Sequence, residues 1–285
     1  MTECSSVLVE SHKGVARVTL NRAHRRNAFD AGMIDELYDA FRTIVQDASL
    51  RVVLLRGNGS VFCAGADLRW MGADRAVSET EARQDAERLF TMFRAIDECP
   101  CPVIARVQGA AYGGALGLIG VCDVAVATDD TVFGLSEVRL GLVPAVIAPF
   151  VVRKMGDSFL RRYGLTGQAF SASAAKEAGL VHEVVPRDAL DARVDELVQN
   201  VSRLAPHAVR TAKSLFRRLP SLSDPEQRTL CIDINVQARL SAEAREGLRA
   251  FHERRPPGWA PKADGPADTE TVREGNSRDA APQRI

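Results

Sequence analysis

The chain has 285 residues, with 37 basic and 37 acidic side chains. Its formal charge is therefore balanced, and no overall field favours nucleic acid or an anionic membrane. A chain of this length can bury a large core. Its start lacks a signal-peptide pattern, no apolar run reaches membrane-spanning length, and the cysteines show neither metal-like nor disulfide-framework spacing. We expect a cytoplasmic protein with free thiols, no metal, and neither nucleic acid nor membrane as partner.

The first part of the chain alternates strand and helix patterns. Apolar and polar residues alternate as in a strand, or recur every three or four positions as in a helix. This alternation up to about residue 195 predicts an α/β core. The expected elements are strands at 15–20, 52–56, 103–107, 124–127 and 132–133, a helix capped by Asp30, and a helix over 79–96 that Pro100 and Pro102 terminate.

The second part reads as helical and then as unstructured. From Asp188 onward, apolar residues recur at helical spacing over 194–201, 208–219 and 231–250. The segment 258–285 is rich in Pro, Gly, Asp, Arg and Ala and almost lacks aliphatic residues, so we predict disorder there. The predicted organisation is a core at 1–195, a helical region at 196–257 and a disordered tail at 258–285.

Two glycine-rich segments carry the functional signal. They read VFCAGADL at 61–68 and GAAYGGALG at 109–117, and each follows an apolar, strand-like run. Glycine lets a backbone approach a ligand closely, because no Cβ is in the way. Two such bends, each offering one backbone N–H, can form an oxyanion hole for a thioester carbonyl. Taken alone, each cluster is more often a tight turn.

With the sequence around them, these segments resemble the enoyl-CoA hydratase/isomerase, or crotonase, superfamily. The resemblance runs from about residue 7 to residue 259 and rests on the order and spacing of several motifs. It implies a crotonase-like spiral of ββα units and a C-terminal helical region that packs against neighbouring subunits of a homotrimer or homohexamer. The motifs are Leu20-Asn21-Arg22, Arg26-Asn27-Ala28, 62–68, Gly113-Gly114, Cys122-Asp123, FGLSEVRLG at 133–141, AGLVHEVV at 178–185 and Glu246-Gly247-Leu248.

The resemblance also implies catalytic roles. It makes the backbone N–H groups of Ala66 and Gly114 the oxyanion donors, with Gly114 at the start of a helix whose dipole adds positive charge. Hydratases of this type typically use two glutamates. Here Gly117 occupies the first position and Glu137 the second. A single carboxyl in an apolar pocket can have a raised pKa and act as acid and base in turn.

The amino-acid sequences of two segments favour one subgroup of the superfamily. Residues 62–71 and 135–149 resemble bacterial methylglutaconyl-CoA and isohexenylglutaconyl-CoA hydratases, which also tend to carry glycine at position 117. We therefore predict an enoyl-CoA hydratase for a methylglutaconyl-CoA-type substrate. On this hypothesis Gly117 leaves space for a branched, carboxylated acyl chain. Arg139 or Arg69 is a candidate partner for its carboxylate, although a surface charge is the commoner role for such an arginine.

Two other functions stay open. Crotonase-type Δ3,Δ2-enoyl-CoA isomerases use a single glutamate at the Glu137 position and need no water. A non-catalytic acyl-CoA-binding protein would also explain the missing carboxylate at Gly117.

The resemblance further implies how coenzyme A is held. The coenzyme is part of the acyl-CoA thioester substrate, and no separate cofactor is expected. Arginine pairs well with phosphate, and Asp67 is expected to fix its loop through hydrogen bonds. The predicted cofactor-binding residues are Arg22, Arg25, Arg26, Ala64, Ala66, Asp67, Leu68 and Arg69.

Overall fold

The structure is a computed structural model that describes residues 5–72 and 76–261. A six-stranded sheet has the order β1-β2-β3-β4-β6-β9, and a three-stranded sheet has the order β5-β7-β8. Strands β1 and β2 are antiparallel, as are β7 and β8, and the other neighbours are parallel. The strands are β1 (Val7–His12), β2 (Val15–Leu20), β3 (Val52–Gly57), β4 (Val103–Val107), β5 (Ala110–Tyr112), β6 (Val124–Thr128), β7 (Val132–Gly134), β8 (Ala169–Ser171) and β9 (Glu183–Val185).

Helices alternate with these strands, which confirms the predicted α/β class. Glu137 lies on a short 3-10 turn, η2 (Glu137–Leu140), directly after the smaller sheet. The α-helices are α1 (Ala31–Gln46), α2 (Glu79–Asp97), α3 (Gly114–Val121), α4 (Ala148–Thr166), α5 (Ala172–Glu177), α6 (Leu190–Ser202), α7 (Pro206–Arg218), α8 (Asp224–Leu240) and α9 (Ala242–His252).

The larger sheet is covered on both faces. Successive side chains of a strand point to opposite faces, and β3 illustrates the result. Val52 and Leu54 pack with α6, whereas Val53 and Leu55 belong to the main core beneath α1, α2 and α3. Burial on both faces explains why β3 reads as a continuous apolar run.

The predicted helix boundaries are confirmed where a cap defines them. Asp30 caps α1, because its Oδ1 accepts a hydrogen bond of 2.9 Å from the backbone N–H of Met33. Ser78 and Glu81 form a reciprocal capping box at the start of α2. Helix α2 ends at Asp97, ahead of the prolines at 100 and 102.

The sequence prediction missed or merged some elements. The elements that were not predicted are β1, β5, α4, β8, α5 and β9. The helical stretch expected over 231–250 is two helices, α8 and α9, separated at Ser241, and the first begins at Asp224. Ser241 has an extended backbone and its hydroxyl accepts a hydrogen bond of 2.9 Å from the N–H of Ala244. The merged prediction was wrong because a capping serine can both end one helix and start the next.

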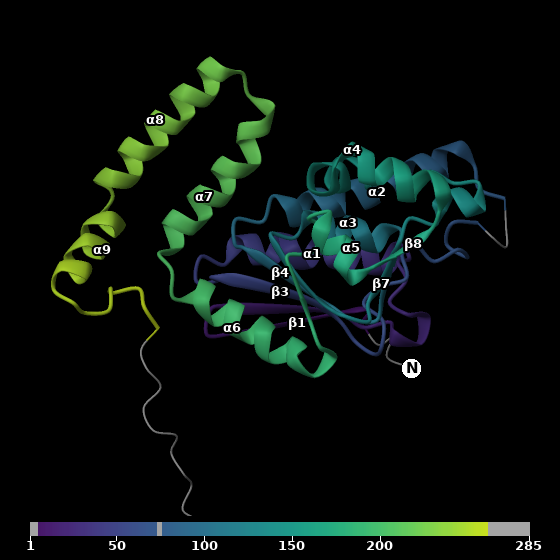
Figure 1. Cartoon of the computed structure of the whole chain (residues 1–285), viewed down its shortest axis with the longest axis horizontal. Coiled ribbons are helices and arrows are strands. Elements are labelled where there is room, and N and C mark those ends of the chain that lie inside the picture. Colours follow the sequence, from purple (N-terminus) through teal and green to yellow (C-terminus); the bar gives the residue numbers. More distant parts are fainter. Residues whose placement is uncertain (1–4, 73–75, 262–285) are drawn as a thin grey trace, which may run out of the picture.

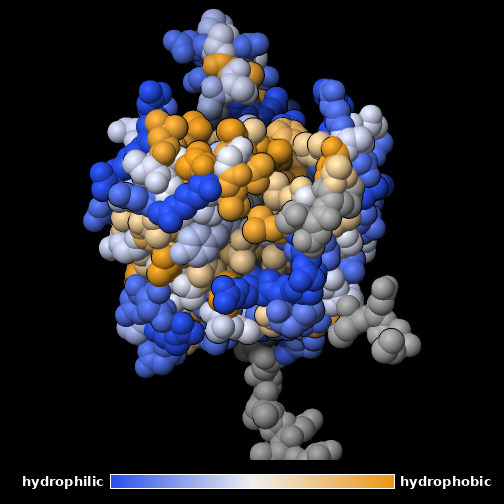
Figure 2. Space-filling view, turned by 90° about the vertical axis from the view of Figure 1, so that its right-hand side faces the viewer, coloured by the Kyte–Doolittle hydropathy of each residue, from blue (hydrophilic) through white to orange (hydrophobic). Residues whose placement is uncertain are grey.

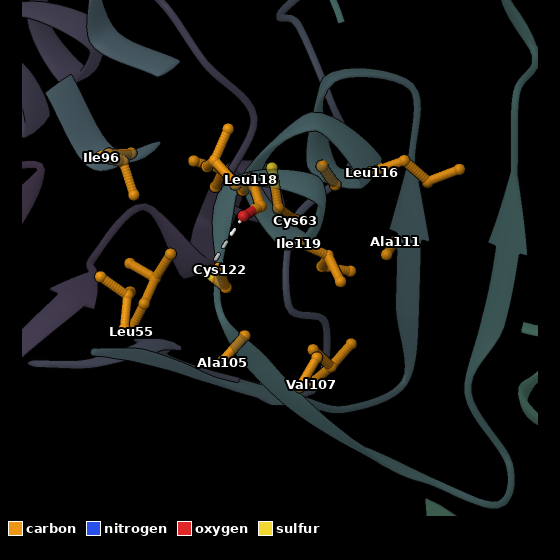
Figure 3. Packing of buried hydrophobic residues seen from close by; sticks show 14 of the residues in the cluster. Leu55, Cys63, Ile96, Ala105, Val107, Ala111, Leu116, Leu118, Ile119 and Cys122 are labelled. Carbon is orange, nitrogen blue, oxygen red and sulfur yellow. Dashed lines mark hydrogen bonds between the residues drawn. The ribbon is translucent and has the colours of Figure 1, made fainter. Parts of the chain in front are cut away.

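Helix α3 is enclosed in the core. Figure 3 shows Leu118, Ile119 and Cys122 packed over side chains of β3 and β4, including Leu55 and Ala105. The carbonyl end of α3 is capped from α4. There the Lys154 ammonium donates hydrogen bonds of 3.0 Å to the carbonyl of Ile119 and 2.6 Å to that of Cys122. A cation at a helix C-terminus stabilises the helix, so α3 is fixed at this end.

Helices α7, α8 and α9 form an arm that extends from one side of the core (Figure 1). Arg210 and Lys213 of α7 attach it, by hydrogen bonds to the carbonyls of Leu50 (2.7 Å) and Cys101 (2.9 Å). The opposite end of the core carries a broad apolar area bordered by hydrophilic side chains (Figure 2).

The predicted end of the core, position 195, falls inside α6, a helix that packs on the sheet through Val194 and Val198. The predicted disordered tail lies outside the described residues from position 262 onward. Within the described ranges, no helix combines the length and apolar character needed to cross a bilayer.

Candidate functional site

The first glycine segment is held in place by Phe29. The Phe29 N–H donates to the carbonyl of Gly65 (2.8 Å), and the Phe29 carbonyl accepts from the N–H of Asp67 (2.7 Å). These bonds use the groups on either side of Ala66, so the Ala66 N–H points away from Phe29. Among the residues described, no group accepts a hydrogen bond from that N–H.

The second glycine segment meets the first. The Gly113 N–H donates to the carbonyl of Gly134 (2.9 Å), and Gly113 has a φ of 53° and a ψ of −119°. Gly114 begins α3, and its N–H likewise has no acceptor in the described part of the chain. A methyl group on Gly65 would lie 2.6 Å from the carbonyl oxygen of Tyr112 and 3.3 Å from the amide nitrogen of Gly114. The two segments are therefore in backbone contact.

Phe29 connects the two segments. Its backbone pairs with Ala66, and its ring lies against Gly114, where an added methyl group would come within 2.8 Å of Cε2. The ring is fully buried and meets Phe93 edge to face, with centroids 6.4 Å apart. Sequence reasoning assigned Phe29 no role, because an aromatic residue beside a helix cap is usually read as core. In the structure it fixes both predicted oxyanion donors.

A cleft of about 750 Å³, counted with the space open to solvent, adjoins these two N–H groups. Its lining is almost entirely apolar or backbone. Only Ser136 and Glu137 bring polar side chains to it, and among the described lining residues only Glu137 is ionisable. The lining residues are Ala64, Gly65, Ala66, Leu68, Met71, Leu89, Gly113, Gly114, Ser136, Glu137, Leu140, Leu142, Val143, Pro144, Ala145, Val146 and Ile147.

Glu137 lies beside the second glycine segment. A methyl group on Gly113 would be 3.1 Å from its Oε1, so the carboxyl packs directly on that glycine. Within the described residues, Oε2 of Glu137 is the one buried side-chain oxygen or nitrogen without a hydrogen-bond partner. Burial raises the pKa of Glu137, and its own backbone N–H opposes this to a smaller extent. The site thus combines a proton-transferring group with two free N–H donors in an apolar cleft.

The structure contradicts the predicted role of Gly117. This residue does not line the cleft, and the space beside it is filled. A methyl group there would lie 2.5 Å from Cγ2 of Ile147 and 2.7 Å from Cζ of Phe93. Gly117 therefore leaves no room for a branched acyl chain, because two apolar side chains occupy the volume that a larger residue would need.

Arg22, predicted to bind coenzyme A, is engaged within its own loop. Its guanidinium lies 2.8 Å from Asp30 and 3.4 Å from Asp67, and it also donates to the carbonyl of Ala28. Its side chain is only 13% exposed. Asp67 in turn accepts a hydrogen bond of 3.1 Å from the N–H of Arg69, which agrees with the predicted loop-fixing role.

The other predicted coenzyme A residues are placed differently. Arg25 and Arg26 are exposed on the loop before α1. Ala64 and Leu68 line the cleft with Ala66, and the carbonyls of Ala64 and Ala66 accept no hydrogen bond within the described ranges. Arg69 is exposed outside the lining, and Arg139 lies on the surface with its side chain near Gly167. The described residues contain no cluster of ligands suited to a metal ion.

Asn27 fixes the first glycine segment by hydrogen bonds to its backbone. It is fully buried, has a φ of 54°, and its amide donates to the carbonyls of Asn58 (2.9 Å), Val61 (2.9 Å) and Phe62 (3.0 Å). Sequence analysis quoted Asn27 only as part of a motif. Its position beside a glycine-rich loop was the available signal, because a buried amide can satisfy several loop carbonyls at once.

Replacing Asn27 with alanine should lower the free energy of unfolding by about 2–3 kcal/mol, because it leaves loop carbonyls unpaired. We expect kcat to fall about tenfold, because the segment that carries Ala66 loses its hydrogen bonds to Asn27. Urea unfolding and steady-state kinetics measure both effects. Asn200→Ala, at an exposed position on α6, is the control. Equal stability of the two variants would contradict the role given to Asn27.

Comparisons with known proteins agree with this arrangement. The family model described as "Enoyl-CoA hydratase/isomerase" matches residues 10–262. The enoyl-CoA hydratase ACTT6 of Alternaria alternata is 35% identical over 84% of this chain and 78% of its own length. The 2,3-dehydroadipyl-CoA hydratase of Escherichia coli is 31% identical over 89% of this chain and 98% of its own. The crystal structure of an enoyl-CoA hydratase from Shewanella pealeana superimposes with a TM-score of 0.84, at 37% identity over 89% of this chain and 96% of that one.

Proposed function

The chain belongs to the enoyl-CoA hydratase/isomerase family, and we propose that it adds water across the 2,3 double bond of an enoyl-CoA thioester. The observation that carries the proposal is the placement of Glu137, whose unpartnered carboxyl oxygen shares an apolar cleft with the free N–H groups of Ala66 and Gly114. The hydratases among its relatives support the same reaction.

The proposed mechanism uses Glu137 alone for proton transfer. The thioester oxygen accepts hydrogen bonds from Ala66 and Gly114, which stabilise the enolate-like charge that develops on it. One oxygen of the neutral Glu137 carboxyl gives its proton to the α-carbon, and the other takes a proton from the water that bonds to the β-carbon. The carboxyl ends neutral, as it began. Burial raises the pKa of Glu137, which increases the share of the carboxyl in this neutral starting form.

We further propose a methylglutaconyl-CoA-type substrate. One support is the sequence of segments 62–71 and 135–149, which resembles that of hydratases of this type. Another is the E. coli relative, whose name denotes a carboxylated acyl chain. The described lining contains no basic side chain. We therefore place the carboxylate of such a substrate at the exposed lining residues Leu68 and Leu140. Each of them is next in sequence to an exposed arginine, Arg69 or Arg139.

Product analysis by mass spectrometry tests these proposals, with crotonyl-CoA, 3-methylglutaconyl-CoA and a 3-enoyl-CoA offered separately. We expect a gain of one water on the 2-enoyl substrates, with kcat/KM for 3-methylglutaconyl-CoA about tenfold or more above that for crotonyl-CoA. A 3-enoyl substrate converted to an isomer of unchanged mass, without hydration of any 2-enoyl substrate, would favour the isomerase. Binding without any turnover would favour a non-catalytic acyl-CoA-binding protein.

Assembly into a homotrimer or homohexamer is also proposed for this chain. The arm supports it, because large apolar side chains on α7, α8 and α9 are exposed in the single chain. Examples are Phe216, Leu240, Leu248 and Phe251, which are between 68% and 85% exposed. A second copy of the chain offers the apolar surface that such residues need.

A further inference from the structure

We propose that Ser136 positions the attacking water in the hydration reaction, beside Glu137 and in place of a second carboxylate. The inference rests on the proposed hydratase function. It follows from three observations. The described lining of the cleft has only two polar side chains, the fold does not use the hydroxyl of Ser136, and the space beside Gly117 is filled.

Few side chains in the described lining of the cleft can hold a water molecule. An attacking water must be oriented so that a lone pair points at the β-carbon while one hydrogen points at a base. Oε2 of Glu137 can accept that hydrogen. The other hydrogen needs a second acceptor, and Ser136 has the only other polar side chain in the described lining. A hydroxyl oxygen can accept such a hydrogen bond.

The hydroxyl of Ser136 is not used by the fold. Ser136 stands at the N-cap of the turn η2, where a serine side chain commonly accepts a backbone N–H. Here it makes no such cap bond, and in the described part of the chain its Oγ has no hydrogen-bond partner. The backbone carbonyl of Ser136 is engaged, because it accepts a hydrogen bond of 3.0 Å from the N–H of Arg139. Ser136 is half-buried and lines the cleft, so its free hydroxyl is available to a ligand or a water.

A second carboxylate cannot stand at position 117. Phe93 and Ile147 fill the space beside Gly117, so a larger side chain has no room there. Among the side chains of the described lining, only Ser136 can therefore give the water a second polar contact beside Glu137. Ser136 directly precedes Glu137, and the geometry places both the base and the orienting hydroxyl on one turn.

Ser136→Ala tests this role through two reactions that differ in their need for water. Hydration of an enoyl-CoA needs a water at the β-carbon. Exchange of the α-hydrogen of butyryl-CoA with deuterium oxide needs the ionised Glu137 carboxylate, which takes the α-proton and exchanges it with the solvent, and the two N–H groups, but no water bonded to carbon. We expect Ser136→Ala to slow hydration about tenfold or more while α-hydrogen exchange stays within about twofold. Ser136→Thr, which restores a hydroxyl, should recover most of the hydration rate.

The controls separate this inference from the proposed function. Glu137→Gln should lose both reactions, and Ser173→Ala, at an exposed position on α5, should lose neither. Equal loss of hydration and exchange in Ser136→Ala, or loss of neither, would overturn the inference. If Ser136→Ala does not fold, Ser136→Cys keeps the size and weakens the acceptor, and the same split is expected. A wild-type protein that exchanges butyryl-CoA but hydrates no enoyl-CoA would overturn the hydratase function itself, and the role of Ser136 with it.

Discussion

Glu137→Gln should reduce kcat for hydration by about a thousandfold or more, because Glu137 is the only ionisable side chain in the described lining of the cleft. The amide keeps the shape of the carboxyl but cannot exchange protons with the substrate. KM should change little, since Ala66 and Gly114 still bind the thioester oxygen. Steady-state kinetics on the preferred enoyl-CoA measures the loss. A variant that kept full activity would show that the proposed mechanism is wrong.

Glu137→Gln should also have a higher melting temperature than the wild type at alkaline pH. Burial raises the pKa of Glu137 above 4.5 in the folded state, so the folded state binds a proton more tightly than the unfolded state. This tighter proton binding stabilises the folded state. The stabilisation is fully present below pH 4.5, the pKa in the unfolded state, and is lost as the pH rises through the pKa of the folded state. Glutamine does not titrate. The melting temperature of Glu137→Gln should therefore exceed that of the wild type at pH 8 and approach it at pH 4. An advantage that grew toward acid pH would contradict this reasoning.

Gly65→Ala should affect both activity and stability strongly. Gly65 has a φ of +87°, which disfavours alanine, and the new methyl group would lie 2.6 Å from the carbonyl oxygen of Tyr112. Relief of this contact moves the two glycine segments apart and separates the two N–H donors. We expect a loss of about 3 kcal/mol in the free energy of unfolding and a fall of about a hundredfold in kcat. Urea unfolding and kinetics measure these changes.

Gly156→Ala is the matched control for Gly65→Ala. Gly156 also has a positive φ, of +70°, but a methyl group there would meet nothing within 4 Å. It lies in α4, outside the lining of the cleft. This variant should lose stability through its backbone alone and keep its kcat. If Gly65→Ala also kept its kcat, contact between the glycine segments would not be what aligns the donors.

The sequence predicted those parts of the fold that local patterns define. The strand at 103–107 and the helix capped by Asp30 were found because periodicity and capping are local properties. Strand β1 was missed, although its pairing with β2 covers every residue from Val7 to His12. Five of those six residues are exposed, so the apolar signal of an edge strand was weak.

The site was predictable in its residues but not in its packing. Glu137, Ala66 and Gly114 do adjoin one cleft. The space beside Gly117, by contrast, depends on Phe93 and Ile147, which come from elements distant in the sequence. A glycine can indicate either an empty volume or a volume filled from elsewhere. Only the three-dimensional arrangement distinguishes the two, and the same holds for the free hydroxyl of Ser136 and for the double role of Phe29.

The arm has a consequence for how the chain unfolds. Among the residues described, α7 and α8 bury no side chain and α9 buries only Ala250. Segments with few buried contacts open at a much lower free energy than the core. In an unassembled chain, local opening therefore exposes the arm to proteases while the sheet and the cleft remain folded. If copies of the chain cover one another's arms on assembly, the rate of this cleavage reports the fraction of chains that are not assembled.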